Sequence, residues 1–182
     1  MPHTNTGRTA LCGVLGALTL VLLALGSVLP MATYAAPMLA AAVLIPLVQD
    51  SPPRFAWLTW AAASVLAAIL LPDRELTAVY ALVLGPYPML KARLDRLPGG
   101  LRPLAKLAVF NAAVLVCYGL LLAVFPVPGL WQEFAAGGLV LTLATLAVGN
   151  VAFVAFDGVL AVLTVVYRRK LRPHLHIFHG NR

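Results

Sequence analysis

The most informative segment of the sequence runs from Gly149 to Arg172 and reads GNVAFVAFDGVLAVLTVVYRRKLR. It is an apolar, helix-forming segment that carries Asn150 and Asp157 and ends in a run of positive charge. An acidic residue in the middle of a membrane helix costs about 3 kcal/mol on insertion scales. We therefore expect Asp157 to face the interior of a helix bundle, with the other apolar segments of the chain packed around it.

The composition of the chain excludes an ordinary water-soluble domain. Of its 182 residues, 62% are hydrophobic and 10% are charged, whereas soluble domains have about 25% charged residues. The formal net charge of +7 would suggest nucleic acid as the partner of a soluble protein. Here the basic residues lie in short loops and tails without an aromatic-basic pattern. We expect them to contact anionic membrane lipids, and we expect no nucleic-acid binding.

Six apolar segments predict an all-α, polytopic integral membrane protein that forms a single membrane domain, residues 1–182. The predicted spans are 9–29, 31–49, 55–71, 76–90, 107–125 and 135–167, followed by a basic tail at 168–182. Pro37 and Pro46 should kink or break the second span, and the GPYP sequence at 85–88 should break the fourth. The last stretch would be about 50 Å long as one helix, against a hydrocarbon core of about 30 Å. It must therefore tilt, begin at the interface or extend beyond the membrane.

The basic residues also predict the orientation of the chain. With six spans both termini lie on one side of the membrane, and 12 of the 13 Lys and Arg residues fall on that side, Arg74 being the exception. By the positive-inside rule this side is the cytoplasm, so we expect a multi-pass protein of the cytoplasmic (inner) membrane of a bacterial cell. Five or seven spans would instead distribute the basic loops over both faces.

Two stripes of polar residues mark the predicted interior of the bundle. Asn150, Asp157 and Thr164 are spaced by seven residues, about two helical turns, and therefore lie on one face of the last span. Asn111 and Tyr118 form a second stripe on the fifth span. We expect the stripes to face each other, and Asn111 or a nearby lysine to satisfy Asp157. The aspartate would bind a substrate or ion, relay a proton or brace the bundle.

Catalytic and metal-binding signatures are missing from the sequence. It has no HExxH, no GxSxG, no Walker lysine motif and no pair of acids placed in one helix, so we expect neither enzyme activity nor a cofactor. Cys12 and Cys117 lie inside apolar runs without metal-ligand spacing. The histidines of the tail, His174, His176 and His179, have no cysteine or acid beside them, so we predict no metal site.

The first span carries small residues at Gly13, Gly16 and Ala17, and the four-residue spacing of Gly13 and Ala17 allows close helix approach. These residues either pack within the chain or dock another subunit. With this motif near the cytoplasm, six spans and both ends inside, the chain resembles the S components of energy-coupling factor transporters. The stretches 85–91, 110–113 and 150–157 are also similar to uncharacterised bacterial membrane proteins of this general shape.

The resemblance to S components implies a subunit that captures a vitamin or metal ion. It would dock through an alanine-x-x-x-alanine motif on its first helix onto a membrane subunit driven by two ATPases. The implied pocket opens to the outside between spans four to six, with Asn150 near its floor and Tyr80 and Tyr118 in its walls. The candidate substrate-binding residues are Asn150, Asp157, Asn111, Tyr118 and Tyr80.

Two other interpretations stay open at this stage. One is a non-transporting membrane scaffold similar to the MreD-type proteins of the cell-shape or division machinery. Its basic loop, predicted at 91–106, and its tail would bind partners or anionic lipids. The other is an autonomous carrier that works as a homodimer.

Overall fold

The computed structural model describes residues 3–29, 32–124 and 128–171, and 88% of this part of the chain is helical, with no strand in it. Four helical segments are long and apolar enough to cross a membrane: Thr6–Val28, Pro53–Leu70, Leu101–Ala123 and Leu143–Lys170. Their outward side chains are apolar, and Val28, Ile69 and Val151 are exposed by 78%, 72% and 72%. Lipid can cover such a surface and water cannot, which fits the predicted all-α membrane class.

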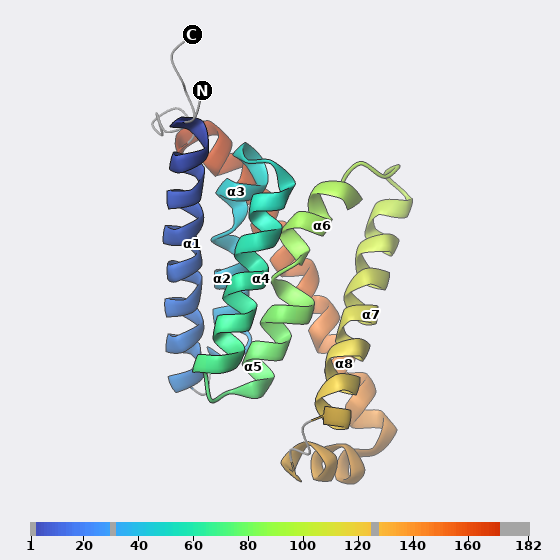
Figure 1. Ribbon diagram of the computed structural model, residues 1–182. Helices are drawn as coiled ribbons and strands as arrows, with labels where there is room; N and C mark the ends of the chain where they lie inside the picture. The colour runs from blue at the N-terminus through green and yellow to red at the C-terminus, as the bar shows by residue number, and fades with distance from the viewer. Residues whose placement is uncertain (1–2, 30–31, 125–127, 172–182) are drawn as a thin grey trace.

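The first half of the chain forms one side of the molecule. Helices α1 (His3–Val28) and α4 (Pro53–Leu70) lie next to each other, and α1 also contacts α2 (Ala35–Ala42) (Figure 1). A Cβ atom on Gly26 would lie 2.2 Å from the Cβ of Ala36. Only glycine therefore allows α1 to approach α2 so closely at this point.

The second apolar segment is divided into α2 and a shorter helix, α3 (Ile45–Asp50). The break at Val43 and Leu44 comes just before Pro46, which lies in the first turn of α3, where its missing N–H has no helical partner. Pro37 is tolerated in the first turn of α2 for the same reason. The predicted break is confirmed next to Pro46, whereas the helix continues through Pro37.

The fourth apolar segment forms three pieces, α5 (Arg74–Ala78), η2 (Val79–Leu84) and α6 (Tyr87–Leu94). The backbone of η2 is wound as a π-helix, and the N–H of Gly85 donates to the carbonyl of Tyr80, five residues earlier, at 2.8 Å. Pro86 and Pro88 have no N–H to continue the α-helical bonds of this segment. The break predicted at 85–88 is therefore confirmed, and it gives α6 a direction of its own.

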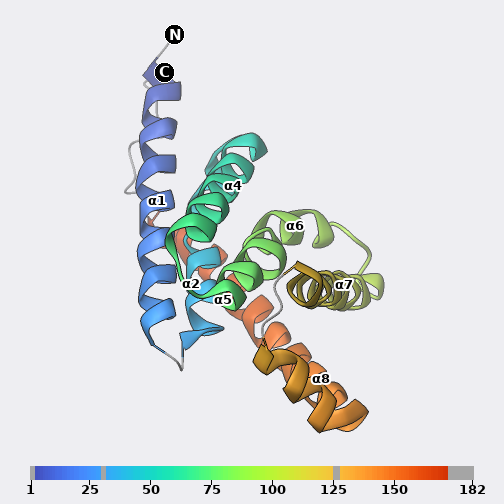
Figure 2. The same cartoon turned by 60° about the horizontal axis from the view of Figure 1, so that its bottom comes forward.

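Helices α7 (Leu101–Val124) and α8 (Pro128–Val166) form the other side of the molecule, and η3 (Tyr167–Leu171) follows α8. Figure 2 shows α1 and α4 on one side, α7 and the first part of α8 on the other, and α2, α5 and α6 between them, while the later part of α8 runs back behind these helices toward α1. Helix α8 is interrupted at Gly138, whose φ of 58° and ψ of −168° are essentially restricted to glycine. The stretch 135–167 is consequently not one straight helix, and the short part before Gly138 runs in a different direction (Figure 1).

Some predicted boundaries are wrong. The region 91–106 is not a loop, because α6 extends to Leu94 and α7 begins at Leu101. Of the six predicted spans, 31–49 and 76–90 are broken into short pieces, so four continuous helices of spanning length are present among the described residues.

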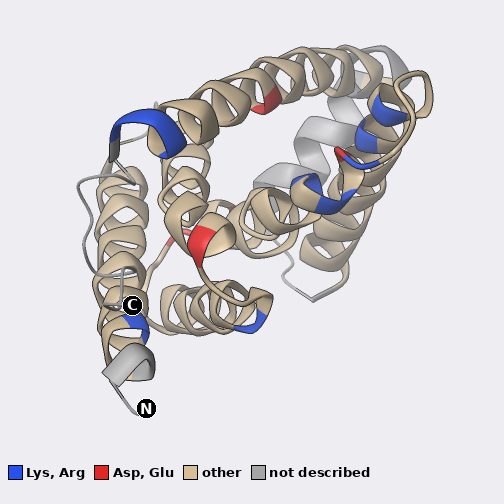
Figure 3. Cartoon of the chain, turned by 90° about the horizontal axis from the view of Figure 1, so that it is seen from above, with Lys and Arg blue, Asp and Glu red and all other residues tan. Residues whose placement is uncertain are grey.

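The turns of the chain gather at two opposite ends of the molecule. The start of α1, the end of α3, the turn after α6 and the segment η3 lie at one end (Figure 1). Figure 3 looks onto this end and shows Lys and Arg positions distributed around it. We call it the basic end. The end of α1, the start of α5 and the end of α7 lie at the opposite end.

Candidate functional site

A cluster of charged side chains lies between α6, α7 and α8. Asp157, near the middle of the candidate span Leu143–Lys170, contacts the ammonium groups of two lysines. Lys106 donates to Oδ2 of Asp157 at 2.9 Å and to Oδ1 at 3.1 Å, and Lys91 forms an ion pair with Oδ1. The lysine side chains are 9% and 10% exposed, and that of Asp157 is 23% exposed. The prediction that a lysine satisfies Asp157 is confirmed. Two lysines do so, Lys91 from α6 and Lys106 from α7.

Two further residues complete this group, which we call the ion-pair cluster: Asp157, Lys91, Lys106, Asp95 and Tyr87. Asp95 lies 2.6 Å from the Nζ of Lys106 and 3.7 Å from that of Lys91. The hydroxyl of Tyr87 donates to Oδ1 of Asp157 at 2.6 Å. Two carboxylates and two ammonium groups give the cluster no formal net charge. This balance is what makes burial tolerable, because an isolated charge in lipid is strongly unfavourable.

The local sequence explains how these side chains meet. Tyr87, Lys91 and Asp95 are spaced by four residues, so one face of α6 and of the turn after it presents all three. Lys106 lies in the second turn of α7. Sequence reasoning assigned Lys91, Lys106 and Asp95 to a loop and missed their role. The four-residue spacing that begins in an apolar segment was the signal available.

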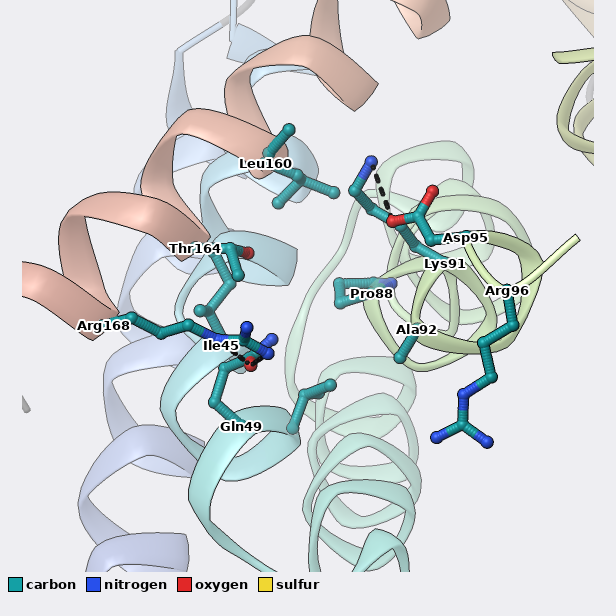
Figure 4. Close-up of a pocket in the computed structure, with 12 residues that line it drawn as sticks. Ile45, Gln49, Pro88, Lys91, Ala92, Asp95, Arg96, Leu160, Thr164 and Arg168 are labelled. Carbon is teal, nitrogen blue, oxygen red and sulfur yellow. Dashed lines mark hydrogen bonds and ion pairs between the residues drawn. The ribbon is translucent and has the colours of Figure 1, made fainter. Parts of the chain in front are cut away.

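A cavity of 550 Å³ adjoins the ion-pair cluster on the side of the basic end (Figure 4). It lies between α3, α6 and the last part of α8 with η3. Its walls are apolar in part, and the polar and charged residues that line it are Gln49, Lys91, Asp95, Arg96, Thr164 and Arg168. Thr164, the third member of the predicted stripe on α8, thus faces this cavity.

The rim of the cavity joins η3 to α3 by polar contacts. Arg168 donates to Oε1 of Gln49 through Nε at 2.8 Å and through Nη2 at 2.5 Å. The hydroxyl of Tyr167 donates to Oδ2 of Asp50 at 2.6 Å. The cavity therefore lies between two polar connections of α8 to the bundle, one at the ion-pair cluster and one at this rim.

The predicted stripes of α7 and α8 do face each other, but their asparagines contact one another and not Asp157. Asn111 donates to the side-chain oxygen of Asn150 at 2.8 Å, and Asn150 donates back at 3.1 Å. Each amide also donates to the backbone carbonyl four residues earlier in its own helix, at 2.8 Å. This reciprocal pair joins two helices, so of the two partners predicted for Asp157 the lysine is found and Asn111 is not.

The two tyrosines predicted as pocket walls lie elsewhere. Tyr118 donates to Oε1 of Glu75 at 2.9 Å, and Tyr34 donates to the same oxygen at 2.9 Å, in a separate polar group beside α5. Tyr80 is fully buried against α1 and α4 residues such as Leu23 and Ala63. Neither Tyr80 nor Tyr118 lines the cavity. The expected outward pocket with Asn150 at its floor is not the cavity found in the described part of the chain.

The small residues of α1 divide between two faces. A Cβ on Gly16 would lie 3.5 Å from the methyl group of Thr59, so Gly16 packs inside the bundle against α4. Gly13 and Ala17 are exposed, and a Cβ on Gly13 would meet nothing within 4 Å. The histidines of the tail lie outside the described residues.

Comparison with known proteins assigns no identity: no protein-family model, curated protein or solved structure matches this chain. The geometry of the ion-pair cluster and its cavity is therefore the basis for a functional proposal.

Proposed function

We propose that this chain is a six-span protein of the cytoplasmic membrane that binds a small molecule as the substrate-binding subunit of an uptake transporter. The observation that carries this proposal is the 550 Å³ cavity beside a charge-balanced cluster whose two lysines are buried. Helices in lipid associate through close packing, so packing alone gives no reason for a cavity of this size. A concave site with apolar walls and a few converging polar groups is the usual form of a small-molecule site.

The arrangement of the turns supports the topology in this proposal. The ends of α1, α3, α6 and η3 that lie together are those near most of the basic residues, and Arg74 starts α5 at the opposite end. The positive-inside rule then places the basic end, with both termini, in the cytoplasm. The segments α2–α3 and α5–η2–α6 each cross as a broken helix. Such breaks are tolerated at membrane depth where the backbone is buried in protein or borders a cavity.

The exposed face of α1 supports a partner in the membrane. Gly13 and Ala17 leave a flat strip on a helix whose opposite face is already used by α2 and α4. Small residues at this spacing favour close helix association. In the proposed function this strip docks the membrane subunit of a transporter, and ATPases attached to that subunit supply the energy.

The scaffold interpretation is the alternative. It relied on a free basic loop at 91–106 that recruits partners or lipids. Lys91 and Lys106 are instead held in the ion-pair cluster, which removes two of the five basic residues from such a role. The cavity also has no use in a pure scaffold, so we prefer the transporter interpretation.

Purification from the native membrane in a mild detergent, with mass spectrometry of co-purifying species, tests the proposal. The matched variants are Ala161→Phe, which fills the cavity, and Ala155→Phe, which changes an exposed position of the same helix. We expect a small molecule, or a transporter subunit with ATPases, in the wild-type sample. The bound molecule should be lost in Ala161→Phe and kept in Ala155→Phe.

Two outcomes would reject the transporter interpretation. Wall-synthesis or division proteins without a bound molecule would move the assignment to the scaffold. A small molecule retained equally by both phenylalanine variants would show that the cavity is not its site.

A further inference from the structure

The lining of the cavity carries positive charge that no carboxylate of the ion-pair cluster neutralises. Within the ion-pair cluster the charges of Lys91 and Lys106 are balanced by those of Asp95 and Asp157. The remaining charged residues that line the cavity are Arg96 and Arg168. In the described part of the chain, no carboxylate lies within ion-pair distance of either arginine. The cavity therefore keeps a formal excess of two positive charges.

The guanidinium of Arg168 is fixed in position by Gln49 and keeps donors for a ligand. It donates two of its five N–H groups to the neutral amide oxygen of Gln49, at 2.8 and 2.5 Å. The amide fixes the position of the guanidinium without neutralising its charge. A positioned guanidinium with further donors binds phosphate oxygens well, because its planar fork matches their geometry. Figure 4 shows Arg168 and Gln49 together on one side of the lining and Arg96 on the other.

The walls between these charges are apolar. Ile45, Pro88 and Leu160 contribute to the lining, while the hydroxyl-bearing Thr164 lies one turn before Arg168. An anion without an apolar part would leave these walls uncovered. Basic pockets between membrane helices on the cytoplasmic side bind anionic lipid headgroups.

We propose that this cavity binds a phosphate-bearing anion with an apolar part, with Arg168 as its direct contact and Arg96 as a more distant attractive charge. The phosphate belongs either to an anionic phospholipid headgroup or to a soluble phosphorylated compound. This inference rests on the proposed function, since it names the ligand class of the same cavity.

Delipidated, full-length protein in a neutral detergent tests the inference by titration with three probes. Dioctanoyl phosphatidylglycerol represents the lipid, phenyl phosphate represents a soluble phosphate with an apolar part, and dioctanoyl phosphatidylcholine is the zwitterionic control. Arg168→Gln should weaken binding of the preferred anion about tenfold, since it removes a charge-assisted contact. Arg96→Gln should weaken it about two- to threefold, because its charge acts from a greater distance through a partly aqueous medium.

Matched controls separate a site from general attraction to a basic surface. Arg169→Gln and Arg93→Gln remove the same charge at exposed positions beside Arg168 and Arg96 that do not line the cavity. Both should change binding by less than about twofold, since charges outside the lining act on a ligand in the cavity only through screened, longer-range attraction. Tighter binding of phosphatidylglycerol than of phosphatidylcholine identifies a headgroup, and tighter binding of phenyl phosphate than of phosphatidylglycerol identifies a soluble ligand.

Equal losses in the lining and control variants, or no preference for either anion, would overturn the inference. If Arg168→Gln fails to fold because its bonds to Gln49 are lost, the pair Arg96→Gln and Arg93→Gln decides the same question. A neutral co-purifying molecule displaced by Ala161→Phe, without anion binding, would reject the phosphate and leave the proposed function standing.

Discussion

The helices on the two sides of this molecule are held together by different interactions. On the side of α1, α2 and α4, small residues bring backbones close, as where Gly26 meets Ala36 and Gly16 meets Thr59. On the side of α6, α7 and α8, polar side chains join the helices, through Asn111 and Asn150 and through the ion-pair cluster. In lipid both are ways to associate helices that gain nothing from burying apolar surface.

The difference shows where the chain can accommodate a ligand. Close backbone packing leaves no room between helices, and a single methyl group disrupts it. Polar contacts reach across a wider gap and can be exchanged for contacts with a ligand or with water. The 550 Å³ cavity lies on the polar side, next to Asp157 and its lysines. We call the side of α1, α2 and α4 the close-packed side and expect it to be rigid. We expect ligand binding and movement on the polar side, formed by α6, α7 and α8.

The largest effect is expected from breaking the ion-pair cluster. Asp157→Ala leaves Lys91 and Lys106 facing only Asp95, so unfolding in mixed detergent micelles should show a loss of about 3–5 kcal/mol. The double variant Asp157→Leu with Lys106→Leu removes one charge of each sign and should be more stable than Asp157→Ala. A single variant as stable as the wild type would contradict the view that the cluster joins these helices.

An intermediate loss of stability is expected on the close-packed side. Gly26→Ala places a methyl group where its Cβ would lie 2.2 Å from the Cβ of Ala36, and overpacking of this kind costs about 1–3 kcal/mol. Thermal unfolding of the purified protein measures the loss. Adding Ala36→Gly to the same chain should restore part of it.

Gly13→Ala is the matched control for this prediction. Its Cβ would meet nothing within 4 Å, so the substitution should be neutral or stabilise α1 by up to about 1 kcal/mol through helix propensity. Destabilisation of similar size at both glycines would show that α1 responds to glycine replacement in general and not to its contact with α2.

The smallest effect is expected at the reciprocal asparagine pair. Asn111→Ala and Asn150→Ala should each cost about 1 kcal/mol, as is typical of hydrogen bonds between membrane helices. Because both remove the same contact, the double variant should lose less than the sum of the two. Additive losses in this double-mutant cycle, measured by unfolding, would mean that the asparagines act independently.

Several features of the fold could be predicted from local sequence. The apolar stretches indicate the membrane class, and Pro46 and the GPYP sequence at 85–88 mark breaks that the structure contains. The stripe of Asn150, Asp157 and Thr164 faces the interior as its spacing predicts. Each of these follows from hydropathy, helical period or a missing N–H. These are properties of neighbouring residues.

The site itself was only partly predictable. The sequence indicated that Asp157 needs a partner, since an unpaired acid is costly in lipid. It did not indicate that Lys91 and Lys106, 66 and 51 residues away along the chain, would both supply it. Nor did it place Tyr80 and Tyr118 away from the cavity. The broken fourth segment redirects α6 and so brings Lys91 to the cluster, which no local pattern reveals.

Composition and helical period therefore indicate a helical membrane protein with an inward-facing acid and a strong charge asymmetry. Composition and periodicity reveal these features because each side chain has its own preference for lipid, water or the protein interior. Tertiary structure alone decided which side chains meet: the lysines with Asp157, the asparagines with each other, and Arg168 with Gln49 at the rim of a cavity. Such choices depend on how distant helices pack, because a polar group in lipid takes whichever partner the packing brings within reach.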